Sequence, residues 1–103
     1  MSEPTPNLEL CSAALTEWGL DAQIGMVNEE VGELLQAINK YMRRADQGTR
    51  VHLMEEIVDV EMMLAQLRMC FDSPVGYGQM LVQKEHRLAE RLGLESPVYG
   101  GTP

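Results

Sequence analysis

Cysteine and aromatic residues are scarce in this chain of 103 residues, which has two cysteines, one tryptophan and one phenylalanine. Two cysteines are too few for the disulfide framework that stabilises small secreted domains. Cys11 and Cys70 also lack the close spacing of metal-binding cysteine pairs. Both fall in apolar helical patterns, so we expect buried free thiols, with a Cys11–Cys70 disulfide as the alternative.

Positive charge is scarce as well, since 8 Lys and Arg stand against 16 Asp and Glu, for a net charge of −8. This balance disfavours nucleic acid and anionic membranes as general partners. No apolar run reaches the roughly 18 residues of a membrane span. Residues 1–10 have neither the basic start nor the apolar core of a signal peptide. We therefore expect a cytoplasmic protein that binds neither nucleic acid nor membrane.

The apolar residues that are present recur at helical spacing, and no segment has the alternation of a strand. We expect helices over residues 8–18, 21–44, 49–71 and 74–92. Five residues supply the expected caps and stops: Asn7, Gly19, Thr49, Ser73 and Gly93. The pattern predicts a single all-α domain over residues 1–103, with flexible ends at 1–6 and 95–103. We expect each protomer to be a four-helix bundle-like unit built on a long antiparallel helical hairpin.

The two long helices carry near-copies of one acidic phrase. The first copy reads Glu29-Glu30-Val31-Gly32-Glu33-Leu34, and the second reads Glu55-Glu56-Ile57-Val58-Asp59-Val60. Like charges this close repel one another and oppose folding. Two matched clusters therefore indicate that a positive species sits between them.

Helical geometry predicts that the two copies meet. Glu30 and Glu33 lie about 60° and 120° from the centre of the first apolar stripe, and Glu56 and Asp59 lie at similar offsets in the same sense on the second helix. If the helices fold back antiparallel with their stripes facing, the four carboxylates converge beside the seam. Such an oxygen cage suits Mg²⁺ or Mn²⁺, with di-iron as an alternative. The simpler interpretation is two solvated acidic flanks on amphipathic helices.

The order Glu-Glu-x-x-Glu, a spacer from Leu34 to Glu55, then Glu-x-x-Asp resembles the signature of MazG-like nucleoside triphosphate pyrophosphohydrolases, in the all-α NTP pyrophosphatase superfamily. The resemblance covers Trp18 to about Leu67. It implies Mg²⁺-dependent hydrolysis of (deoxy)nucleoside triphosphates to monophosphate and pyrophosphate, by attack of water on the α-phosphate, and a role in nucleotide-pool house-cleaning. It also implies metal ligands at Glu30, Glu33, Glu56 and Asp59, and a catalytic Glu29 that orients or deprotonates the attacking water.

A polyphosphate substrate also requires cations beside the metal. Lys84, Arg87 and Arg91 share one flank of the fourth helix and are candidates for this role. The alternative is a solvated basic face. Lys40 and Arg44 continue the Glu30–Glu33 flank toward the turn, so they are placed either to reach phosphates or to pair with neighbouring acids.

Trp18 and Gln23 are candidates for a base pocket, through stacking and hydrogen bonding, although a core position for Trp18 is as consistent with the pattern. The two histidines, His52 and His86, have no helical ligand partner of a suitable type. We interpret both as structural or surface groups.

The second long helix has a further apolar stripe on another side, formed by Met54, Val58, Met62, Ala65 and Met69. A helix that is apolar on two faces must be covered on both. This predicts a homodimer or homotetramer, with a Met-rich groove for a peptide or a membrane as the alternative.

Two functions of other classes stay open. A ferritin-like di-metal bundle requires Glu-x-x-His motifs, whereas Gln36 lies three residues after Glu33 and Asp59 three residues after Glu56. A non-catalytic interaction or regulatory protein is the other alternative, with its acidic residues serving a partner.

Overall fold

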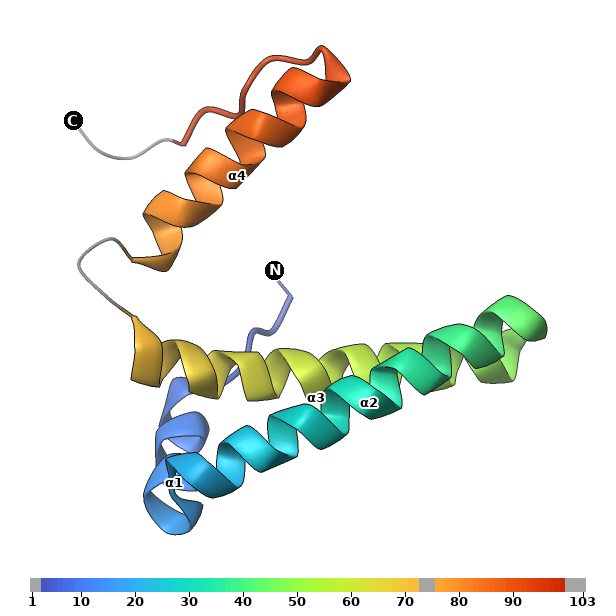
Figure 1. The fold of residues 1–103 in the computed structure, drawn as a ribbon, viewed down its shortest axis with the longest axis vertical. Coiled ribbons are helices and arrows are strands. Elements are labelled where there is room, and N and C mark those ends of the chain that lie inside the picture. The colour runs from blue at the N-terminus through green and yellow to red at the C-terminus, as the bar shows by residue number, and fades with distance from the viewer. Residues whose placement is uncertain (1–2, 73–75, 100–103) are drawn as a thin grey trace. The chain divides into compact units, whose positions relative to one another are not determined.

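The computed structural model describes residues 3–72 and 76–99, and its regular structure there is entirely helical (Figure 1). The helices are α1 (Leu8–Trp18), α2 (Leu20–Arg43), α3 (Gln47–Phe71) and α4 (Tyr77–Leu92). The prediction of an all-α fold is confirmed. None of the described helices is both long enough and apolar enough to cross a membrane.

Local chemistry accounts for both ends of α1. The Oδ1 of Asn7 accepts a hydrogen bond from the amide of Leu10 at 2.9 Å, which caps the first turn as predicted. The helix ends at Gly19, whose φ of 85° is a conformation that other residues adopt only with strain. The chain therefore changes direction at this glycine before α2 begins.

The turn between α2 and α3 is closed by Asp46. Its Oδ1 accepts from the amide of Thr49 at 2.9 Å, and the Oγ1 of Thr49 accepts from the amide of Asp46 at 3.0 Å. The prediction that Thr49 caps the helix is therefore wrong. Asp46 occupies the cap because its carboxylate both accepts the amide and carries negative charge to the positive end of the helix. As a result α3 begins at Gln47.

The chain forms two compact units, Met1–Phe71 and Asp72–Pro103. The second contains α4, which ends at Gly93 in the left-handed conformation (φ 68°), as the stop signal predicts. The predicted cap at Ser73 and first-turn Pro74 lie outside the described residues. As described, α4 begins at Tyr77.

In the first unit α2 and α3 lie side by side and run in opposite directions, and α1 packs against both (Figure 1). Their packed faces differ from the predicted ones. Glu56 and Met63 are buried in α3, whereas Leu64 is 44% exposed. In α2, Gln23 and Ala37 are buried, whereas the stripe residues Ile24, Val31 and Ile38 are 37–38% exposed.

The contact face of each helix is therefore rotated toward its acidic flank, by roughly 70–80° when the buried positions are placed at 100° per residue. Glu56, expected beside the seam, is buried within it, and the half-buried Glu30 lies at its edge. Small side chains such as Ala37, which is 0% exposed, permit this close approach. The outer half of each apolar stripe remains open to solvent.

The two cysteines differ in their exposure to solvent. Cys11 is buried and Cys70 is exposed, and both are free thiols. The prediction of free thiols is confirmed for both residues, whereas the predicted burial is confirmed for Cys11 and wrong for Cys70. Cys70 lies one residue before the end of α3, on the same side of the helix as the buried Met63, and is left uncovered at this end.

Candidate metal centre

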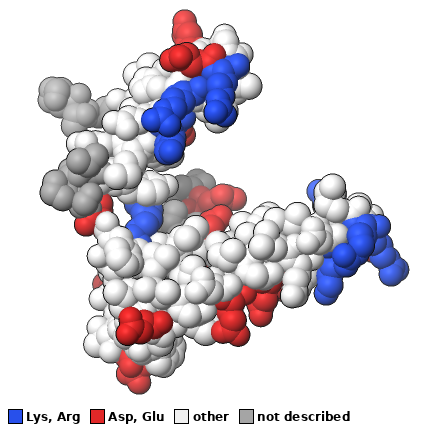
Figure 2. Space-filling model, viewed as in Figure 1, with Lys and Arg blue, Asp and Glu red and all other residues white. Residues whose placement is uncertain are grey.

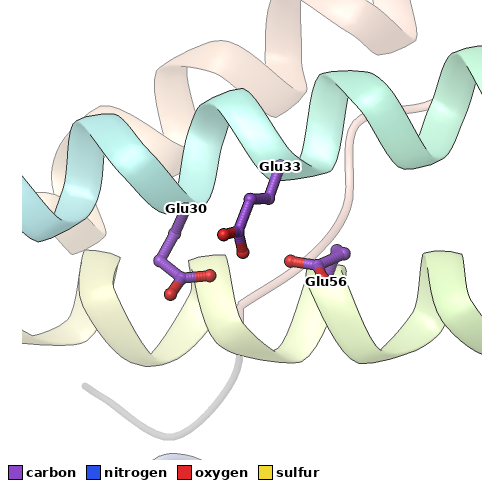
Figure 3. A group of neighbouring side chains, drawn as sticks. All are labelled: Glu30, Glu33 and Glu56. Atoms are coloured by element: carbon purple, nitrogen blue, oxygen red, sulfur yellow. The ribbon is translucent and has the colours of Figure 1, made fainter.

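Three carboxylates from two helices meet in the first unit. Glu30 and Glu33 lie one turn apart on α2, and Glu56 lies on α3. One carboxylate oxygen from each lies within 4.8 Å of those of the other two. Figure 3 shows Glu30 and Glu33 pointing from α2 toward α3, where Glu56 lies beside them. The two copies of the acidic phrase are therefore brought together.

Two oxygens of this cluster are buried and unsatisfied. The Oε2 atoms of Glu30 and Glu56 are inaccessible to solvent and have no hydrogen-bond partner among the described residues. An ionised carboxylate oxygen in this state raises the free energy of the folded chain, because it has lost water without gaining a donor. A cation between the helices would provide the missing interaction.

The electrostatics of the cluster follow from this geometry. Burial raises the pKa of Glu30, and the negative charges of Glu33, Asp59 and Glu56 raise it further. Burial likewise raises the pKa of Glu56, together with the charges of Glu33 and Asp59. Both carboxyls thus resist ionisation in the protein alone. A bound cation would reverse these shifts, since its charge stabilises the anionic form.

Asp59 lies outside the group of three. It is one turn beyond Glu56 on α3, and its charge raises the pKa values of both Glu30 and Glu56. Of the four predicted ligands, three therefore converge and the fourth acts on them through its charge. That these residues bind a metal remains a prediction.

Glu29, the predicted catalytic residue, is exposed on α2 next to Glu30. Trp18 is 64% exposed at the end of α1 and is not a core residue. Lys40 is exposed on α2 near the turn. The three predicted phosphate-binding residues of the fourth helix are exposed on α4, in the unit Asp72–Pro103: Lys84, Arg87 and Arg91.

Gln23, predicted for a base pocket, is 4% exposed. Its Nε2 donates to the Oε1 of Gln66 at 2.6 Å, which joins α2 to α3. The partner Gln66 is a residue that the sequence analysis missed, although a glutamine between Ala65 and Leu67 in an apolar stretch is the pattern typical of a buried polar contact.

His52 is a second residue that the sequence analysis did not place near the site. It is half-buried, and its charge lowers the pKa of Glu56 against the stronger effects that raise it. The available signal was its position four residues before Glu56, which puts the two side chains on one face of the helix. The imidazole at the border of the carboxylate cluster therefore offsets part of the repulsion that the neighbouring acids exert on Glu56.

The donor set of the described cluster consists of carboxylate oxygens alone. Oxygen donors of this kind suit Mg²⁺ or Mn²⁺, whereas zinc sites are typically built with histidine and cysteine. Fold and site together define an all-α protein with an acidic candidate metal centre between two antiparallel helices. Comparison with protein-family models, curated proteins and solved structures finds no match for this chain.

Proposed function

We propose that this protein is a Mg²⁺-dependent nucleoside triphosphate pyrophosphohydrolase, with Mn²⁺ as a substitute, that hydrolyses (deoxy)nucleoside triphosphates to monophosphate and pyrophosphate. The observation that carries the proposal is the convergence of Glu30, Glu33 and Glu56 within 4.8 Å. The unsatisfied buried oxygens of Glu30 and Glu56 support it, because they fit a cation-binding site. The resemblance of the acidic phrases to the MazG-like signature supplies the reaction.

In this proposal Glu30, Glu33, Glu56 and Asp59 hold the metal. The bound ion would neutralise phosphate charge and make a water more acidic. Glu29, the exposed neighbour of Glu30 on α2, is the proposed residue that orients the water attacking the α-phosphorus and accepts its proton.

Substrate binding is assigned to the exposed groups. Lys40 and the α4 cations Lys84, Arg87 and Arg91 bind the phosphates, and the exposed indole of Trp18 stacks on the base. Gln23 contributes by holding α2 against α3, since its amide is already bonded to Gln66.

We further propose that the protomer is a four-helix bundle-like unit built on the α2–α3 hairpin and that it assembles as a homodimer or homotetramer. Large apolar side chains are exposed on every described helix, including Leu10 at 67%, Leu35 at 57%, Met54 at 58% and Leu88 at 54%. Apolar surface on this scale is typical of an interface.

The test is product analysis by ³¹P NMR with a panel of NTPs and dNTPs, in Mg²⁺ and in EDTA. We expect Mg²⁺-dependent formation of monophosphate and pyrophosphate, abolished in Glu56→Gln. The matched control is Glu55→Gln, an exposed neighbour outside the cluster of three, which should keep its activity. Diphosphate and orthophosphate would contradict attack at the α-phosphate, and an absence of turnover with every nucleotide would contradict the proposed activity.

A further inference from the structure

The turn end of the α2–α3 pair carries a second charged cluster, opposite in sign to the first. Half of the chain's 8 cationic residues fall within residues 40–50, where Asp46 is the sole acid. These are Lys40, Arg43, Arg44 and Arg50. Figure 2 shows cationic side chains gathered at the end of the helix pair. In a chain of net charge −8, this concentration creates a local attraction for anions.

Part of this cluster surrounds an open hollow of about 280 Å³, lined by Lys40, Arg43, Arg44 and Thr49. Pockets for drug-sized ligands have volumes of roughly 300–1,000 Å³. The hollow lies at the lower edge of this range and has room for a phosphate group. Arg50 belongs to the same charged end but does not line the hollow.

The cations of the hollow are available to a ligand. Within residues 3–72 and 76–99, the side chains of Lys40 and Arg43 form no ion pair or hydrogen bond. The Nε of Arg44 lies 3.3 Å from the Oδ2 of Asp46, and the Oδ1 of Asp46 is held by the amide of Thr49 at 2.9 Å. Asp46 thus holds the guanidinium of Arg44 through its Nε, and the remaining N–H donors of Arg44 stay exposed to solvent.

We propose that this hollow is a binding site for a phosphate group, either free or at the end of a polyphosphate. Guanidinium groups bind phosphate oxygens through paired hydrogen bonds, and Lys40 adds a third point of charge. The hollow lies about 10 Å along α2 from the carboxylate cluster, measured from Lys40 to Glu33, and shares only Lys40 with the residues assigned to the substrate phosphates. It requires neither bound metal nor turnover and so goes beyond the proposed activity.

The test follows the arginine Nε–Hε signals by NMR while inorganic phosphate or pyrophosphate is added in EDTA, with sodium chloride at equal ionic strength as the reference. We expect saturable shifts of Arg43 and Arg44 that chloride does not produce. Arg43→Gln should weaken binding roughly fivefold, the upper range for an exposed ion pair. Arg50→Gln, the matched control, should leave affinity nearly unchanged.

A gain of affinity gives a second test. Asp46→Asn keeps a good capping side chain and removes the negative charge beside Arg44, so phosphate should bind more tightly. All three substituted positions are exposed, and circular dichroism will verify that each variant is folded. If Arg43→Gln and Arg50→Gln weakened phosphate binding equally, or if Asp46→Asn did not increase the affinity, the proposed site would be wrong. Phosphate would then be attracted by the general positive charge of this end of the helix pair.

Two arms distinguish the sources of phosphate. Shifts with inorganic phosphate in EDTA, retained in Glu33→Gln, identify the free anion as a ligand. Shifts that appear only when a nucleoside triphosphate and Mg²⁺ are both present, and that are lost in Glu33→Gln, identify a different ligand. That ligand is the terminal phosphate of a nucleotide held at the carboxylates. Specific shifts in neither arm would refute the proposal, whatever the hydrolase assay shows.

Discussion

At the scale of single residues, Glu56 is under electrostatic strain in the protein alone. It is 8% exposed, its Oε2 has no partner among the described residues, and burial together with the neighbouring acids raises its pKa. Replacing it with the neutral Gln removes this repulsion. In EDTA at neutral pH we therefore expect Glu56→Gln to melt at a higher temperature than the unsubstituted protein, as measured by circular dichroism.

Saturating Mg²⁺ should raise the melting temperature of the unsubstituted protein, because an ion that binds only the folded chain stabilises it. Glu56→Gln should lose most of this increase, whereas Glu55→Gln should keep it. A lower melting temperature of Glu56→Gln in EDTA, with an undiminished response to Mg²⁺, would contradict both the strain and the ligand assignment.

The raised pKa values of Glu30 and Glu56 predict how stability depends on pH. Well below their ordinary value of 4.5, both carboxyls are protonated in the folded and unfolded chains. As pH rises above 4.5, the unfolded chain releases these protons first, so the folded chain binds more protons. The free energy of unfolding must then fall with increasing pH until the folded carboxyls have ionised as well.

Urea denaturation at a series of pH values in EDTA measures this decline. The double variant Glu30→Gln, Glu56→Gln should show a shallower decline, and saturating Mg²⁺ should reduce it in the unsubstituted protein. An identical decline in the double variant would show that the general excess of acidic residues, rather than the cluster, is responsible.

At the scale of helices, the bond between Gln23 and Gln66 joins α2 to α3 inside the seam. Gln66→Ala leaves the buried amide of Gln23 without its partner, so we expect a loss of about 1–3 kcal/mol in the free energy of unfolding. Gln36→Ala, at an exposed position of α2, should change it by less than about 0.5 kcal/mol. Similar values for the two variants in urea denaturation would show that the buried bond is not stabilising.

The cap of α3 gives an independent prediction at the same scale. Asp46→Ala removes the acceptor of the Thr49 amide and should lower the free energy of unfolding by about 1 kcal/mol. Asp46→Asn retains an acceptor and should recover most of this loss in the same denaturation assay. If Asp46→Asn were as destabilised as Asp46→Ala, charge at the helix end, rather than hydrogen bonding, would be the main contribution of Asp46.

At the scale of the whole molecule, the exposed apolar surface predicts self-association. Val58 is 48% exposed on α3, so Val58→Lys introduces a charge without entering the core of the protomer. We expect this variant to sediment as a smaller species than the unsubstituted protein, because a charge buried at an interface carries a large desolvation penalty. Asn39→Lys, on the polar face of α2, is the control and should leave the assembly unchanged. A monomeric unsubstituted protein would contradict the prediction.

Helical periodicity, with caps at Asn7, Gly19 and Gly93, was sufficient to predict an all-α chain, because these signals act within a few residues of backbone. The sequence also indicated that Glu30, Glu33 and Glu56 would meet, since the two acidic phrases lie at similar angular offsets from the apolar stripes of two antiparallel helices. Local spacing thus determined which elements form and which residues are candidates for the site.

The rotation of α2 and α3 about their axes was decided only by tertiary packing. Small residues such as Ala37 allow the helices to approach on their acidic flank, which buries Glu56 and leaves Leu64 exposed. The Gln23–Gln66 bond and the environment of His52 follow from that rotation. A periodic pattern specifies which residues share a face, but which part of a broad face is buried depends on the shape of the helix that packs against it.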